Sequence, residues 1–124
     1  MKYLVMIYSD DSLLGALPEG EFDTMMHGCF MHADELQKDG YLHGSQQLEG
    51  PATAKTIRAR NGQVSVVDGP FAETKEYLGG FNLIEAENME EAVRIASEFP
   101  WSRTGAIEIR PVRDMDAVRR RVGA

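Results

Sequence analysis

Four charged residues with the chemistry of acid-base catalysis fall within nine residues of one another. Asp68 precedes a Gly-Pro pair at 69–70, and Glu73, Lys75 and Glu76 follow that pair. A turn of this kind presents its side chains to a cleft, and neighbouring carboxylates push each other's pKa values apart, so that one serves as an acid and another as a base. We interpret Asp68 and Glu73 as a candidate catalytic pair, and Lys75 as the cation that holds an anionic group.

The same segment has a structural interpretation, which the sequence leaves open. Asp68 would then pair with Lys55 across a hairpin, and Phe71 would fill the core. If the segment instead lines a site, Phe71 and Glu76 join the ligand contacts. Tyr8 ends the first predicted strand, where its hydroxyl would reach a cleft beside this segment, although the same position also suits the core.

The histidines and the single cysteine are weaker candidates. His27 is a further candidate catalytic residue, but Asp23, one helical turn earlier, offers it an ordinary surface partner. His27 and His32 lie about 140° apart in helical projection and share no ligand face. With His43 they make no dense cluster, so we expect no metal site. Cys29 falls in an apolar stripe, where a thiol acts as a small hydrophobe rather than as a nucleophile.

The charge balance argues against nucleic acid as a partner. The chain carries a formal net charge of −7, with 20 Asp and Glu against 13 Lys and Arg. Phosphate binding needs clustered cations, and the one cluster is at 119–121. Because it follows Asp114 and Asp116, we interpret it as the cationic end of a short helix in a tail over 113–124.

Length and cysteine content indicate the kind of protein. A chain of 124 residues that is 43% hydrophobic suits one globular domain, which we place at 1–112. A single cysteine permits no intramolecular disulfide and suits a reducing compartment. The apolar run at 3–8 is too short for a signal peptide, and no run is long enough to cross a membrane. We therefore expect a cytoplasmic protein with no membrane partner.

Apolar periodicity predicts six strands and two helices. The strands are expected at 2–8, 41–48, 53–60, 63–68, 77–86 and 104–111, and the helices at 21–39 and 88–99. The first helix would bury Phe22, Met26, Cys29, Ala33 and Leu36, and the second Met89, Ala92, Val93, Ala96 and Phe99. Asn88 and Glu91 form a candidate capping box. Pro100 ends the second helix, and we interpret the adjacent Trp101 as its cap.

A hairpin is predicted around Asn61-Gly62, a strong two-residue turn signal. Such a loop pairs residues whose numbers sum to 123, which places Ile57 opposite Val66 and Ala59 opposite Val64. The apolar match on this face supports the register.

The order of elements predicts an α+β fold of the ferredoxin-like β-α-β-β-α-β kind, with an extra central hairpin and an antiparallel sheet. Two helices can cover only one face of that sheet. The first strand is apolar on both faces, one carrying Tyr3, Val5 and Ile7 and the other Leu4, Met6 and Tyr8. The uncovered face needs a partner, and a second copy of the same sheet is the simplest one, so we expect a homodimer.

A long motif runs through the middle of the chain. It reads Asp68-Gly69-Pro70-Phe71-Ala72-Glu73-Thr74-Lys75-Glu76 and continues as Leu78-Gly79-Gly80-Phe81. These residues closely resemble the signature of the DGPF family, part of the wider YCII-related group, and the resemblance covers most of 1–112. It implies a dimeric α/β barrel, in which two ferredoxin-like sheets face each other, and a bacterial origin. In other YCII-related proteins a His-Asp pair has been proposed as catalytic, with the His on the first helix, where His27 lies.

The resemblance implies little about the reaction, since the family is largely uncharacterised. Our leading hypothesis is a small-molecule enzyme without a tightly bound organic cofactor, performing isomerase- or lyase-type proton transfer in a cleft beside the motif. The alternative is a non-catalytic dimer that binds a metabolite or a regulatory protein. Pairing of the motif carboxylates with Lys55, Arg110 or backbone amides would favour this alternative, and an open pocket around them would favour catalysis.

Overall fold

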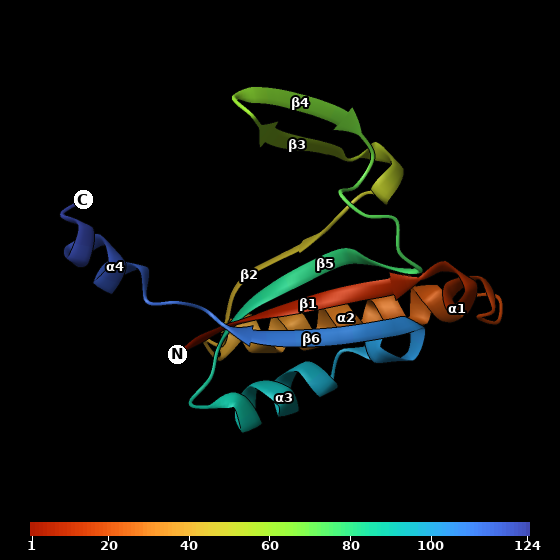
Figure 1. Ribbon diagram of the computed structural model, residues 1–124. Coiled ribbons are helices and arrows are strands. Elements are labelled where there is room, and N and C mark those ends of the chain that lie inside the picture. Colours follow the sequence, from red (N-terminus) through yellow and green to blue (C-terminus); the bar gives the residue numbers. More distant parts are fainter.

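The computed structural model describes residues 1–124, which form six strands and four α-helices (Figure 1). The strands are β1 (Lys2–Asp10), β2 (Leu42–Gln47), β3 (Lys55–Arg60), β4 (Gln63–Asp68), β5 (Glu76–Glu85) and β6 (Gly105–Pro111). The helices are α1 (Asp11–Gly15), α2 (Glu21–Lys38), α3 (Met89–Ser97) and α4 (Met115–Val122), with 3-10 turns η1 (Pro51–Thr53) and η2 (Pro100–Thr104). The predicted α+β class is confirmed.

Four strands form one antiparallel sheet in the order β2-β5-β1-β6. This order is compatible with a ferredoxin-like plan, in which the first and third core strands lie at the centre. Helices α2 and α3 lie on the same side of the sheet (Figure 1). The opposite face of the sheet therefore has no helix over it.

The core lies between this sheet and the helices α2 and α3. Tyr3 and Val5 of β1 pack with Ile84 of β5 and with Phe99, and Ile7 is packed against the same cluster. These β1 residues are alternate positions along one strand, so they share the face that was predicted for them. Burying a large apolar side chain contributes about 1.5–3 kcal/mol, and this face anchors both helices.

Both helices bury much of the stripe that periodicity predicts. In α2, Leu36 is buried, and Met26, Cys29 and Ala33 pack against the core. Phe22 lies at the exposed first turn of α2, while Met25, which the stripe did not include, is buried. Compared with the predicted orientation, α2 is therefore rotated slightly about its axis, so that Met25 faces the core.

In α3 the stripe is shifted by a fraction of a turn. Ala92 and Ala96 are buried as predicted, but Ile95 is also buried, while Met89 and Val93 are exposed, so their predicted burial is wrong. Ala92, Ile95, Ala96 and Phe99 recur at helical spacing, so the buried stripe of α3 is centred on them.

The N-terminus of α3 carries the predicted cap in a modified form. The Asn88 side chain accepts a hydrogen bond from the backbone N–H of Glu91 at 2.9 Å, and the Glu91 carboxylate accepts one from the backbone N–H of Glu87 at 3.1 Å. The reciprocal bond of the capping box therefore reaches one residue farther back than predicted.

The hairpin of β3 and β4 forms its own two-stranded sheet, which stands away from the four-stranded sheet and from α2 and α3 (Figure 1). The predicted register is confirmed, with Ile57 opposite Val66 and Ala59 opposite Val64. Asn61 and Gly62 have φ values of 53° and 75°, as a tight turn with two left-handed residues requires.

Two further helices follow strands of the sheet in sequence, α1 after β1 and α4 after β6. The short helix α1 was not among the helices that periodicity predicts, and Asp10 caps it by accepting a hydrogen bond from the Ser12 backbone N–H at 2.9 Å. Helix α4 is capped by Asp114 and carries its three arginines in the last turn. None of the helices has the length and hydropathy that a bilayer-spanning segment requires.

Candidate functional site

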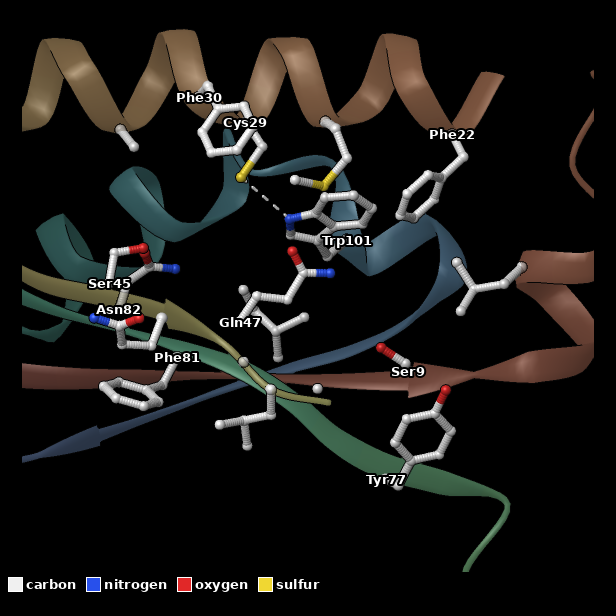
Figure 2. A pocket seen from close by; sticks show the side chains of 18 of the residues that line it. Ser9, Phe22, Cys29, Phe30, Ser45, Gln47, Tyr77, Phe81, Asn82 and Trp101 are labelled. Atoms are coloured by element: carbon white, nitrogen blue, oxygen red, sulfur yellow. Dashed lines mark hydrogen bonds between the residues drawn. The ribbon is translucent and has the colours of Figure 1, made fainter. Parts of the chain in front are cut away.

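A pocket of about 480 Å³ lies between α2 and the sheet (Figure 2). Volumes of this size are typical of small-molecule sites. It is lined by Ile7, Ser9, Leu14, Phe22, Met26, Cys29, Phe30, Ala33, Ser45, Gln46, Gln47, Leu48, Gly50, Tyr77, Gly79, Gly80, Phe81, Asn82 and Trp101. None of these residues is charged at neutral pH in its ordinary state.

The shape of the pocket depends on a glycine pair in β5. The β1–β5 register shifts between Ile7 and Tyr8, and the strands continue past Gly79 and Gly80. A Cβ atom on Gly80 would lie 2.9 Å from the backbone carbonyl oxygen of Gln46 on β2, which is closer than real Cβ contacts. The backbones of β2 and β5 therefore approach closely at this glycine pair, at the edge of the pocket.

Aromatic side chains form the end of the pocket nearest η2. The rings of Phe22 and Trp101 have centroids 5.7 Å apart at an interplanar angle of 45°. The Trp101 indole N–H donates a hydrogen bond to the Cys29 Sγ at 3.3 Å, drawn as a dashed line in Figure 2. Burial raises the pKa of the Cys29 thiol, so the sulfur stays protonated and acts as a neutral acceptor here.

Polar side chains from the sheet point into the same space. Asn82 and Ser45 lie side by side on β5 and β2, and Gln47 lies closer to Trp101 (Figure 2). Asn82 is only 3% exposed, and no group of the protein makes a hydrogen bond to its side-chain amide. No fully buried polar side-chain atom is left without a partner, so the Asn82 amide keeps its access to the pocket. Its hydrogen-bonding capacity is available to a ligand.

Carboxylates gather at the rim of the pocket beyond Ser9. The Tyr77 hydroxyl donates a hydrogen bond to the Asp11 carboxylate, which raises the pKa of Tyr77. Asp10 accepts a bond from the Ser12 hydroxyl at 2.6 Å, and this bond is the main cause that lowers the pKa of Asp10. The Lys75 ammonium lies 3.7 Å from the other Asp10 oxygen and lowers that pKa further. The rim thus holds a fixed carboxylate and a protonated phenol.

Comparison with known proteins places this architecture in a family. A profile of the YCII-related domain matches residues 1–116. The chain is also 34% identical to an uncharacterized protein of Rhizobium meliloti (strain 1021) over 114 residues, which cover 90% of this chain and 92% of that protein. This chain belongs to the YCII-related family. The sequence resemblance to that group is therefore confirmed.

In this YCII-related chain the motif divides between two places. Asp68 ends β4 and pairs with Lys55 at 2.6 Å across the hairpin, as the structural interpretation predicted. Phe71 is 79% exposed and does not fill the core, so that part of the interpretation is wrong. Its carbonyl oxygen accepts a hydrogen bond from Arg58 at 3.1 Å, and Glu73 is also exposed. Asp68, Phe71 and Glu73 all lie outside the pocket lining.

The later motif residues reach the pocket rim. Glu76 opens β5 directly opposite Asp10 of β1, and Lys75 contacts the Asp10 carboxylate. The next residue along β5, Tyr77, lines the pocket. The structure therefore brings Lys75 and Glu76 near the pocket but leaves Asp68 and Glu73 outside its lining.

The two remaining candidates of this YCII-related chain also lie outside the pocket. His27 is exposed on α2 and does not line the cavity. Tyr8 belongs to the sheet face without helices, and its hydroxyl lies 3.9 Å from the Met6 sulfur. His32, by contrast, has a structural position, because its ring lies 2.9 Å from the Ile95 carbonyl oxygen and joins α2 to α3. No group of three His, Cys, Asp or Glu side chains has an arrangement that could hold a metal ion.

Sequence reasoning missed Asn82 and Asp10, and it misassigned Trp101. Asn82 occupies a core-facing position two residues before Ile84, and a polar residue in such a position is the signal that could have found it. The Asp10-Asp11-Ser12 run carries the pattern of a helix cap. Trp101 is buried beside α2 and lines the pocket rather than capping α3, because η2 carries it back under the sheet.

Proposed function

We propose that this YCII-related protein binds a small molecule in the pocket beneath α2. The observation that carries the proposal is a cavity of about 480 Å³ in which 11 of 19 lining residues are hydrophobic and a few polar side chains converge. Apolar walls with a small number of placed polar groups are the usual composition of a ligand site.

The ionisable groups favour binding over catalysis. General acid-base catalysis works best with a group whose pKa lies near the operating pH. Among the lining residues only Cys29 and Tyr77 can ionise, and the pKa of each is raised away from neutrality. A pocket built this way holds a ligand through shape and hydrogen bonds.

A proton-transfer enzyme is the second candidate. The contact between Lys75 and Asp10 favours it, because this contact joins the motif loop to the pocket rim. In that function Asp68 and Glu73 would supply the acid and the base once the loop folds toward the ligand. The double substitution Asp68→Asn with Glu73→Gln, which keeps the size of both side chains, would abolish turnover. Unchanged turnover would remove these two residues from any mechanism.

We further propose that two copies pair through the surfaces without helices, as in a dimeric α/β barrel. Leu4, Met6 and Tyr8 lie on the sheet face that α2 and α3 leave open. On the hairpin, Ile57 is 70% exposed and Val64 is 69% exposed. A hairpin this apolar is marginal in water by itself, so a protein partner would stabilise it.

The dimer is tested by light scattering on the purified protein. We expect twice the mass of the chain for the wild type and a shift toward the monomer for Val66→Lys, which places a charge in the apolar hairpin face. Thr53→Lys on η1 is the control for added charge. A wild-type mass equal to one chain at micromolar concentration would refute the pairing.

The pocket is tested with Trp101, the single tryptophan of the chain, as a fluorescent reporter. We expect toluene to change its emission saturably and Ala33→Leu, which fills the pocket from α2, to weaken toluene binding about tenfold. Gln37→Leu adds the same side chain to an exposed position of α2 and should leave binding unchanged. Equal affinity in the wild type and Ala33→Leu would contradict the proposed site.

A further inference from the structure

The hydrogen-bonding state of Asn82 limits which ligands suit the pocket. An Asn side chain offers two N–H donors and a carbonyl acceptor. Buried polar groups in native proteins are nearly always bonded, yet this amide, at 3% residue exposure, has no partner in the protein. A ligand that bonds to the amide would supply the missing interactions.

The lack of charge narrows the ligand further. No Lys, Arg or His lines the pocket, and no Asp or Glu does either. An ionised carboxylate or an ammonium group placed beside Asn82 would lose its hydration without gaining an opposite charge, which is costly. The part of the ligand that reaches Asn82 is therefore neutral.

The aromatic side chains that line the pocket indicate the shape of the apolar part of the ligand. Phe22 and Trp101 stand together at one end, and Phe30 lies above Cys29 on α2 (Figure 2). Aromatic side chains favour flat partners, which stack on a ring face or pack edge to face. A planar ring thus fits between α2 and the sheet.

These observations deepen the proposed small-molecule function and rest on it. We propose that the ligand is a neutral planar molecule carrying an amide, with an adjacent C=O and N–H that pair with the Asn82 amide. A primary carboxamide or a lactam meets an Asn side chain through two parallel hydrogen bonds, one N–H···O in each direction. A ketone matches only the donor of Asn82, and a hydrocarbon matches neither group.

The experiment compares four probes of similar size by Trp101 fluorescence. The probes are benzamide, acetophenone, benzoate and toluene. Benzamide and acetophenone share a ring and a carbonyl oxygen, and only benzamide adds the N–H donor. In the wild type we expect benzamide to bind about tenfold more tightly than acetophenone or benzoate, since the site bonds both of its polar groups.

The same titration on Asn82→Leu tests whether Asn82 is the recognition residue. This variant should lose the preference for benzamide over acetophenone while it still binds toluene. Gln37→Leu, which removes an exposed amide near the C-terminal end of α2 and outside the pocket lining, should keep the wild-type preference. If Asn82→Leu fails to fold, the ranking of the probes on the wild-type protein still decides the question.

The outcomes separate this inference from the proposed function. Equal binding of benzamide and acetophenone by the wild type would overturn the amide inference and leave a small-molecule pocket in place. Tightest binding of benzoate would overturn the neutral-ligand argument. If no probe, toluene included, changes the Trp101 emission, both the inference and the proposed function fail.

Discussion

Asn82→Leu should stabilise the ligand-free protein. Asn82 is 3% exposed and its side-chain amide makes no hydrogen bond within the protein, and a fully buried amide in that state would cost about 1–3 kcal/mol. The amide retains access to the pocket, so water relieves part of that cost. We therefore expect Asn82→Leu to raise the free energy of unfolding by about 1–2 kcal/mol. The neighbours of Asn82 on this face are Val5 and Ser45, and the open pocket leaves room for the larger Leu side chain.

The gain is measurable as a melting temperature. Unfolding entropy of about 2.1 cal/mol/K per residue gives about 0.26 kcal/mol/K for 124 residues, so the expected rise is about 4–8 °C. Differential scanning calorimetry at equal protein concentrations provides the comparison, with Gln37→Leu as the control for an added surface leucine. A free energy of unfolding that is lower in Asn82→Leu than in the wild type by more than about 1 kcal/mol would refute the reasoning. The amide would then stabilise the protein rather than remain free for a ligand.

Three further changes have expected outcomes. The pKa of Asp10 is lower in the folded protein than its ordinary value of 3.8, so the ionised carboxylate stabilises the fold at pH values above 3.8. This stabilisation is lost as the pH falls through the folded-state pKa. Between about pH 5 and pH 2 the urea midpoint of Asp10→Asn should therefore decline less steeply than that of the wild type. Gly80→Ala places a Cβ atom 2.9 Å from the Gln46 carbonyl oxygen. We expect urea titration to show a free energy of unfolding that is lower by about 1–3 kcal/mol. An unchanged free energy of unfolding would mean that β2 shifts freely to make room for the added methyl group. Asp68→Asn breaks the 2.6 Å ion pair with Lys55, in which both side chains are largely exposed. Urea titration should therefore show a free energy of unfolding that is lower by less than about 1 kcal/mol. A loss above about 2 kcal/mol would contradict its surface character.

The strands and the hairpin could be predicted because local patterns determine them. The Asn61-Gly62 turn admits one register, and that register pairs Ile57 with Val66 and Lys55 with Asp68, as the structure does. Alternation along β1 likewise separates its two faces before any partner is known. Such features depend on residues a few positions apart, which the sequence displays directly.

The pocket could not be predicted in the same way, because its lining comes from separate parts of the chain. Trp101 and Cys29 are 72 positions apart in sequence, and only the path of η2 under the sheet brings the indole N–H to the sulfur. Charged residues drew attention to Asp68 and Glu73, whereas the cavity is lined by uncharged side chains, Asn82 among them. A single amide in a strand carries no spacing motif, so only its burial reveals it.

The motif acquires a physical role from where its two ends lie. Its first residues close the hairpin, with the Thr56 hydroxyl donating a hydrogen bond to the Gly69 carbonyl oxygen at 2.8 Å. Its last residues join Asp10 through Lys75 and deliver Tyr77 to the pocket. One segment therefore connects the apolar hairpin, where we propose that a second copy binds, to the rim of the proposed ligand pocket.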